Sequence, residues 1–326
     1  MMYLLFIVGL ILLIYGGDWF VDGATGIARC FHLPELLIGA TVVSIGTTLP
    51  EVMVSTTSAI QGHSQIAYGN AIGSIICNTA LIAAISAAVR PSAVNKKTLR
   101  TPVIFFFIAA AFYVAVAYTS GYFSRPIGII LLIIFVLYMI ANVMGMKEDP
   151  SAADQAAVSE SDEADSEDGP VWKMILLLVV GAALIAVGAD LLVDNGTLIA
   201  QALGVPESVI ALTFVALGTS LPELVTAITS LIKGHSSLSL GNVIGANVFN
   251  LVLVCGLSIT VSPFSIPQNS TLFGINASLV VDLPVMLFVM LLLTVIPLVK
   301  GRTSRAQGIS LLIIYAAFCV YQFVLG

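Results

Sequence analysis

The chain of 326 residues contains two copies of one pattern, and this duplication limits its possible folds more than any other feature. Residues 7–78 align without a gap on residues 179–250, a shift of 172 positions, with 31 identities in 72 positions. The centres of the two copies read Gly46-Thr47-Thr48-Leu49-Pro50-Glu51 and Gly218-Thr219-Ser220-Leu221-Pro222-Glu223. The fold must therefore accommodate a carboxylate and a helix-breaking proline inside an apolar run of each half.

Apolar runs long enough to cross a bilayer recur along the chain. Hydrophobic residues make up 59% of the sequence, charged residues 9%, and the mean hydropathy is +1.07, which excludes an ordinary soluble domain. We predict an all-α membrane protein with ten spans, each matched to a hydrocarbon core of roughly 30 Å. The expected spans are residues 2–24, 36–60, 65–89, 99–119, 126–146, 172–195, 208–232, 237–261, 279–299 and 307–325. The first run lacks a basic n-region and a cleavage site, which favours a span over a removed signal peptide.

An acidic segment separates the two halves. Nine of the eighteen acidic residues lie between Glu148 and Asp168, in a stretch rich in Ser and Ala and free of aromatic residues. We expect residues 147–171 to form a disordered linker between a first half, residues 1–146, and a second half, residues 172–326. A solvated tether is favoured over a regulatory calcium-binding role for this run.

The basic residues predict the orientation of the spans. If the spans alternate, eleven of the twelve Lys and Arg residues fall on one side of the membrane and Arg125 alone on the other. Both termini are then expected outside the cell, with the linker in the cytoplasm. Because five is an odd number, the second half enters the membrane from the opposite side. This gives two inverted five-helix repeats, an architecture of secondary transporters.

Two further acidic pairs belong to the duplication. Asp18 and Asp22 recur as Asp190 and Asp194. We expect both pairs near the cytoplasmic ends of spans one and six. Solvation at the interface is favoured for them over a part in an ion access path.

The acidic motif is expected to break spans two and seven. Pro50 and Pro222 lack an N–H and clash with the preceding turn, which would free carbonyls around residues 44–47 and 216–219. Gly46 and Gly218 permit unwinding there. Irregular backbone at this depth lines a polar cavity or is buried in protein, and an ionisable residue marks an ion or substrate pathway. Freed carbonyls, hydroxyls and carboxylates form an all-oxygen set, which suits hard cations such as Na⁺ and Ca²⁺ better than zinc.

A second motif follows in the next span of each half. Polar or small residues spaced i, i+4 and i+8 share one helix face there: Asn70, Ser74 and Asn78 in the first half, and Asn242, Ala246 and Asn250 in the second. Glycines at 69, 73, 241 and 245 form small-xxx-small pairs, for which we favour a packing role. For Asn78 and Asn250 we favour contact with a cation over a role as interhelical glue.

Glu51 and Glu223 are the main candidates for function. The alternative is a pair of buried, neutral acids that only cap half-helices, because burial alone favours the protonated carboxyl group. No Lys, Arg or His lies in the same spans at equal depth to pair with them. Inverted halves would also bring the two acids to one pseudo-symmetric site, so we favour a functional role.

The two motifs resemble the alpha-repeats of the sodium/calcium exchanger family, within the cation/calcium antiporter superfamily, and most of all its compact prokaryotic members. The resemblance extends over nearly the whole chain. It implies a secondary antiporter, not an enzyme, that exchanges Na⁺ for Ca²⁺ across the cell membrane. It implies no cofactor and no nucleic-acid partner; the partners are the two ions and the lipid bilayer, and the functional unit is a monomer.

The resemblance also implies the ligands. Glu51 and Glu223 would bind calcium centrally and share sodium. The flanking ligands would be Thr47, Thr219, Thr48, Ser220, the backbone carbonyls of Ser44 and Ala216, and Ser74, Asn78 and Asn250. Two departures stand out: Ala246 replaces a serine of some members, and Asn250 replaces an aspartate of the potassium-dependent branch. The neutral amide argues against potassium co-transport.

Rival functions remain open at this point. In a proton/calcium exchanger the two glutamates would carry H⁺, but the hydroxyls around them favour sodium, since a proton needs no coordination cage. An intramembrane enzyme is disfavoured because no HExxH or GxSxG pattern occurs. A channel is disfavoured because channels seldom need a duplicated, inverted site.

Overall fold

The chain is described by a computed structural model, which covers residues 1–31, 33–148, 170–202, 218–267, 271–272 and 274–325. Nearly all of this described part is helical, as predicted. The described part also contains two short antiparallel strand pairs, β1 (Tyr122–Phe123) with β2 (Phe264–Ser265), and β3 (Thr271–Leu272) with β4 (Ile275–Asn276). Eight helical segments of the described chain are long and apolar enough to cross a membrane. Most of the predicted linker, residues 149–169, lies outside the described residues.

The helices of the first half follow the predicted spans within a few residues at most ends. They are α1 (Met2–Cys30), α2 (Glu35–Ile38) continued by the π-helical η1 (Gly39–Val43) and α3 (Ser44–Ile60), α4 (Ser64–Cys77) continued by the π-helical η2 (Asn78–Ile82) and α5 (Ala83–Val89), α6 (Lys96–Thr119) and α7 (Arg125–Glu148). α1 extends six residues beyond the predicted end at residue 24. Its C-terminal part is buried, so it has no need to stop at the membrane boundary.

The second half repeats this order. Its helices are α9 (Val171–Ala202), α12 (Leu221–Ile232), α13 (Ser236–Phe249) continued by the π-helical η4 (Asn250–Val254) and α14 (Cys255–Val261), the π-helical η5 (Ser278–Asp282) continued by α15 (Leu283–Lys300), and α16 (Arg305–Leu325). The π-helical turns η2 and η4 begin at Asn78 and Asn250, again 172 residues apart. The duplication therefore preserves even this irregularity of the backbone.

The first acidic motif does not break its helix, so the predicted unwinding at Gly46 is wrong. α3 runs without interruption through Gly46 and Pro50. The irregular turn lies earlier, in η1, where the Ser44 N–H bonds to the Gly39 carbonyl five residues back. A proline inside a membrane helix removes a single hydrogen bond, and packed neighbours can replace it.

The second acidic motif lies at a helix start in the described chain. α12 begins at Leu221, after the turn residues Thr219 and Ser220. Pro222 falls in the first helical turn, where an N–H has no partner within the helix, so its absence costs little. Residues 203–217, which include Ala216 and the start of predicted span seven, lie outside the described residues.

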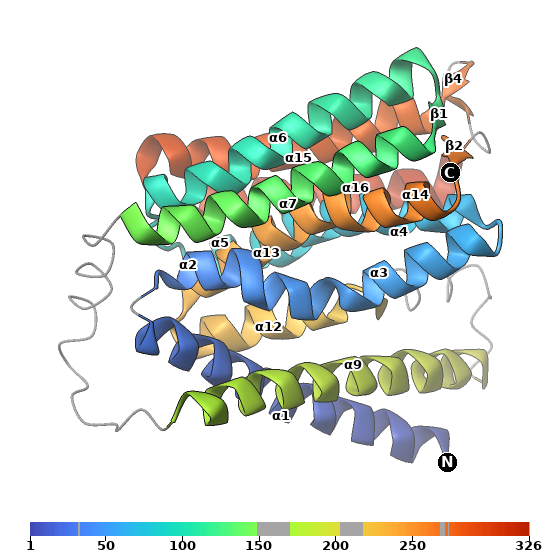
Figure 1. The fold of residues 1–326 in the computed structure, drawn as a ribbon. Coiled ribbons are helices and arrows are strands. Elements are labelled where there is room, and N and C mark those ends of the chain that lie inside the picture. Colours follow the sequence, from blue (N-terminus) through green and yellow to red (C-terminus); the bar gives the residue numbers. More distant parts are fainter. Residues whose placement is uncertain (32, 149–169, 203–217, 268–270, 273, 326) are drawn as a thin grey trace.

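α1 and α9 lie side by side along one edge of the molecule, away from α6, α7 and α15 (Figure 1). They run antiparallel, because Gly9 near the start of α1 meets Gly188, whereas Gly23 meets Met174 near the start of α9. A Cβ on Gly9 would lie 2.9 Å from the Gly188 carbonyl oxygen. Small residues thus let the two helix backbones touch.

This antiparallel packing corrects the expected place of the acidic pairs. Asp18 and Asp22 lie toward the C-terminal end of α1, and Asp190 and Asp194 toward the C-terminal part of α9. Since the helices run in opposite directions, the pairs fall toward opposite ends of the molecule. The prediction that both lie near the same side of the membrane is therefore wrong. Lys233, at the end of α12, has its Nζ 2.7 Å from Asp22 Oδ1 and 3.4 Å from Asp18 Oδ1.

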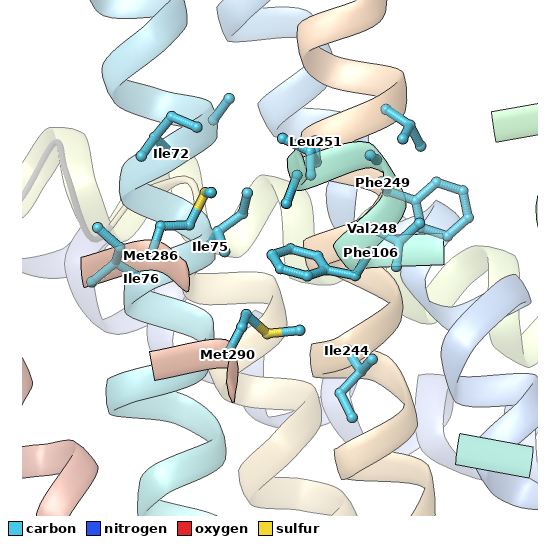
Figure 2. Close-up of a cluster of buried hydrophobic side chains, with 14 of the residues drawn as sticks. Ile72, Ile75, Ile76, Phe106, Ile244, Val248, Phe249, Leu251, Met286 and Met290 are labelled. Atoms are coloured by element: carbon cyan, nitrogen blue, oxygen red, sulfur yellow. The ribbon is translucent and has the colours of Figure 1, made fainter. Parts of the chain in front are cut away.

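A buried apolar cluster joins the two halves (Figure 2). Its labelled members come from α4, α6, α13, η4 and α15, and none is more than 1% exposed: Ile72, Ile75, Ile76, Phe106, Ile244, Val248, Phe249, Leu251, Met286 and Met290. On α4 and α13 these side chains occupy positions other than those of the second motif. The apolar face of each helix is thus committed to the core, which leaves the polar face for the site.

Candidate functional site

Two fully buried carboxylates form the centre of the site. Glu51 on α3 and Glu223 in the first turn of α12 both have an exposed fraction of 0%, and they interact electrostatically. Thr48 Oγ1 donates a hydrogen bond of 3.4 Å to Glu223 Oε1. Within the described chain, the other three carboxylate oxygens have no hydrogen-bond partner, and no basic side chain forms an ion pair with either acid. Such an arrangement is costly unless a cation or protons neutralise it.

Hydroxyl groups of the first motif are held by the opposite half. Thr47 Oγ1 donates to Asn242 Oδ1 over 3.2 Å. Ser44 Oγ lies 3.0 Å from the Asn242 backbone oxygen and 3.3 Å from its Oδ1. It also lies 2.7 Å from the Gly39 carbonyl oxygen, so this hydroxyl contacts the first residue of the π-helical turn η1 as well. Two predicted site residues therefore share one contact residue, Asn242.

The second acidic motif shows the same kind of pairing with the halves exchanged. Thr219 Oγ1 donates to Asn70 Oδ1 over 3.0 Å, and Asn70 is the residue equivalent to Asn242. Ser220 Oγ lies 3.4 Å from Ser74 Oγ. The structure thus brings together the hydroxyls that the sequence places on separate helices, each pair linking one half to the other.

Asn78 and Asn250 are completely buried at the first residue of a π-helical turn. Both have an exposed fraction of 0%, and neither amide oxygen nor amide nitrogen has a hydrogen-bond partner among the described residues. Buried amides are normally satisfied, so four free amide atoms at two equivalent positions need an explanation. π-helical turns are frequent at functional sites. A ligand or ordered water at each side chain would satisfy them.

Asn70 and Asn242 contact predicted site residues, although the sequence interpretation did not assign either asparagine to the site. Their repetition at the 172-residue shift was the available signal. Of the other predicted residues, Ser44 and Thr47 both contact Asn242, Thr48 contacts Glu223, and Ser220 contacts Ser74. Ala216 lies outside the described residues.

The glycines of the second motif set the distance between α13 and the first half. A Cβ on Gly241 would lie 2.9 Å from the Leu36 carbonyl carbon, and one on Gly245 would lie 2.6 Å from Ala40 Cα. Neither position has room for a side chain. The predicted packing role is therefore confirmed for Gly241 and Gly245, and this close approach is what places Asn242 against Ser44 and Thr47. For Gly69 and Gly73 the prediction is wrong, because a Cβ at either position would meet no neighbouring atom within 4 Å in the described chain.

A small crevice, with a volume of about 10 Å³, lies beside both acidic motifs. Its lining comes from both halves: Phe20, Gly46, Thr47, Pro50, Ala182, Ile185, Ala186 and Pro222. At this crevice, residues of α1 and α9 therefore lie next to Thr47 and Pro50 of the first acidic motif.

The site offers oxygen ligands in an otherwise apolar interior. Carboxylates, hydroxyls and amide oxygens are the donor set of hard cations, and Ca²⁺ takes six to eight of them in flexible geometry. Among the described residues, no group of three or more His, Cys, Asp or Glu side chains could hold a metal ion. A cation held by the two carboxylates would therefore need neutral oxygens to complete its coordination shell.

Comparison with known proteins gives one consistent result. A family model described as sodium/calcium exchanger protein matches residues 1–144 and 173–324. The putative antiporter CaxA of Alkalimonas amylolytica is 34% identical over 320 residues, covering 98% of this chain and 97% of CaxA. The sodium/calcium exchanger MaX1 of Methanosarcina acetivorans is 32% identical over 352 residues, covering 98% of each. A solved structure of the sodium-calcium exchanger NCX_Mj, soaked with 2.5 mM Na⁺ and 0.1 mM Ca²⁺, superposes with a TM-score of 0.81 at 31% identity, covering 100% of this chain and 98% of that one.

Proposed function

The chain belongs to the sodium/calcium exchanger family, and we propose that it is a secondary antiporter that exchanges Na⁺ for Ca²⁺ at the Glu51–Glu223 site. The observation that carries this proposal is the pair of fully buried carboxylates, three of whose four oxygens have no partner in the described chain. Buried charge of one sign requires a counter-charge. In this family the available counter-charge is the transported cation.

The charge of the site explains exchange without leak. Two carboxylates neutralise one Ca²⁺ or host Na⁺ ions, but the two kinds of ion compete for the same central oxygens. An empty, doubly charged cavity resists closure, because burying unpaired charge is costly. Each bound ion set removes that penalty and lets the halves move between outward and inward openings.

We assign the ligands by the contacts of the site. Glu51 and Glu223 are the central ligands for both ions. The surrounding oxygens come from Thr47, Thr48, Ser44, Ser74 and Asn78 of the first half and from Thr219, Ser220, Asn250 and the Ala216 carbonyl of the second. Asn78 and Asn250 are included because their amide oxygens are buried without a partner in the described chain.

The proposed architecture has ten spans in two inverted five-helix repeats that work as a monomer in the cell membrane. The antiparallel packing of α1 and α9, which are equivalent helices of the two halves, supports inversion. The family match omits residues 145–172, which supports a linker between the halves. The basic residues favour a cytoplasmic linker and termini outside the cell.

The test is ⁴⁵Ca²⁺ uptake into proteoliposomes that contain the purified protein and carry an outward gradient of Na⁺, H⁺ or K⁺. We expect uptake with the Na⁺ gradient and none with the others. Uptake driven by H⁺ alone would replace this proposal with a proton/calcium exchanger. If removal of K⁺ abolishes sodium-driven uptake, the neutral Asn250 does not exclude potassium and that part of the proposal fails. Empty liposomes give the background.

A further inference from the structure

The two halves exchange an equivalent threonine–asparagine hydrogen bond in each direction beside the site. Asn242 of the second half accepts from Thr47 of the first half, and Asn70 of the first half accepts from Thr219 of the second. The four residues form two pairs related by the 172-residue shift. Each asparagine therefore contacts the threonine that lies four residues before the glutamate of the opposite half.

We propose that Asn70 and Asn242 are positioning residues that orient the Thr219 and Thr47 hydroxyls for cation binding. This inference rests on the proposed cation site. A hydroxyl has one proton and two lone pairs. When the proton is donated to an amide oxygen, the lone pairs are left for a cation. An amide does this without adding a charge, whereas a carboxylate at the same place would itself compete for the ion.

The orientation of the Asn70 amide is determined by its neighbours. Its Nδ2 lies 2.7 Å from Ser55 Oγ and 3.3 Å from the Glu51 backbone oxygen. A backbone oxygen only accepts hydrogen bonds, so the amide nitrogen must face it and the amide oxygen must face Thr219. Thr219 is therefore the donor in that pair. The same amide also touches the backbone of Glu51, which ties the hydroxyl of one half to the carboxylate-bearing residue of the other.

The position of Asn242 is fixed by close backbone packing. Gly241 and Gly245 on either side of it press against Leu36 and Ala40, leaving no room for a Cβ. The Asn242 backbone oxygen accepts a hydrogen bond from Ser44, and its side chain has an exposed fraction of 0%. Packing thus holds the Asn242 backbone beside the first half, and its amide oxygen lies 3.2 Å from Thr47 Oγ1, an arrangement that suits a preorganised ligand shell.

A double-mutant cycle separates positioning from simple helix packing. Asn242→Leu removes the acceptor at similar volume, and Thr47→Val removes the hydroxyl. We expect Asn242→Leu to raise the half-saturating Ca²⁺ concentration by about 3- to 10-fold, with a smaller change in maximal rate. In the Thr47→Val background the same substitution should add little, because the hydroxyl it positions is already gone. Calcium-dependent thermal stabilisation of the purified protein gives a readout independent of transport.

Asn142→Leu is the matched control. Asn142 is buried on α7 and its Nδ2 donates to the Tyr138 carbonyl of the same helix, 2.8 Å away, so its loss should leave calcium affinity unchanged. Multiplicative effects of Asn242→Leu and Thr47→Val would overturn the proposal, as would a loss of stability with unchanged calcium affinity. If Asn242→Leu does not fold, the half-buried pair Asn70→Ala with Thr219→Val decides by the same criteria. Absence of calcium binding and transport in the wild-type protein would instead refute the proposed function.

Discussion

The two halves supply the same charges to the site and different surroundings for them. Glu51, Thr47 and Asn78 have identical counterparts in Glu223, Thr219 and Asn250. Three serines of the first half have alanine counterparts in the second: Ser44 with Ala216, Ser55 with Ala227, and Ser74 with Ala246. Charge must stay balanced between the halves if one site is to serve two openings, whereas neutral hydroxyls are free to diverge.

One consequence of this difference appears in the asparagine pair. The Asn70 amide nitrogen donates to Ser55. The Asn242 amide nitrogen has no partner in the described chain, and the residue equivalent to Ser55 is Ala227. The two amide oxygens therefore make equivalent hydrogen bonds, to Thr219 and Thr47. The two amide nitrogens differ, because only that of Asn70 has a partner in the described chain.

The largest expected effect tests the shared charges. Glu51→Gln and Glu223→Gln each keep the shape of the side chain and remove one of two negative charges. Sodium-driven ⁴⁵Ca²⁺ uptake should fall by about tenfold or more in both, because a unit of buried charge is worth several kcal/mol. Glu35→Gln is the control, since Glu35 is partly exposed and lies 2.5 Å from His235 Nδ1, away from the central pair. Near-normal uptake in both variants would refute the site.

The next effect tests the contact that brings the halves together. Gly245→Ala would place a Cβ 2.6 Å from Ala40 Cα and 2.7 Å from its carbonyl oxygen, so two helix backbones must separate. Overpacking of this kind costs about 1–3 kcal/mol or more. Gly46→Ala is the milder counterpart, because the nearest neighbours of its Cβ would be the Phe20 ring, at 3.2 Å, and Ala182 Cβ, at 3.9 Å. Melting temperatures in detergent should fall clearly more for Gly245→Ala; equal losses would contradict this account of the interface.

A smaller effect tests the difference between the halves directly. Ser55→Ala gives the first half the residue of the second and removes the 2.7 Å hydrogen bond from Asn70. We expect a loss of about 0.5–1.5 kcal/mol in unfolding free energy. Ala227→Ser, the reverse exchange, offers Asn242 the missing acceptor and should raise stability by less. Calcium-free thermal unfolding measures both, and a stabilising Ser55→Ala would show that this hydroxyl has no role in holding Asn70.

The smallest effect concerns the ends of the molecule. Lys233 pairs with Asp18 and Asp22, and its counterpart in the first half is the neutral Gln61. Lys233→Gln gives the second half the same neutral residue that the first half has at Gln61. Because the pair is partly exposed, its loss should cost about 1 kcal/mol or less. The difference in melting temperature from wild type should shrink as NaCl rises from about 0.1 M to about 1 M; a difference that persists would point to a buried role.

The sequence alone predicted most of the described helices and singled out two acids that the structure buries. Apolar runs predicted the described helices to within a few residues at most ends, because lipid demands length and hydrophobicity of each segment by itself. The duplication singled out Glu51 and Glu223, which the structure buries completely. It also singled out Asn78 and Asn250, where both π-helical turns begin. These features are local, or are repeated at a fixed shift, and so can be read along one chain.

Only the tertiary structure decided where the helix irregularity falls and which residues meet. The irregular turn before the first acidic motif lies in η1 and not at Gly46. The Ser44 hydroxyl lies against the Gly39 carbonyl there and also contacts Asn242 of the other half. The hydrogen bond from Thr47 to Asn242 joins residues 195 positions apart. The opposite placement of the two acidic pairs likewise follows from α1 lying antiparallel to α9. Such contacts depend on how closely two backbones approach, which small residues permit but do not specify. The physical reason is that packing depends on residues that are distant in the sequence. Hydrophobic patterning, by contrast, shows only which residues of one segment avoid water.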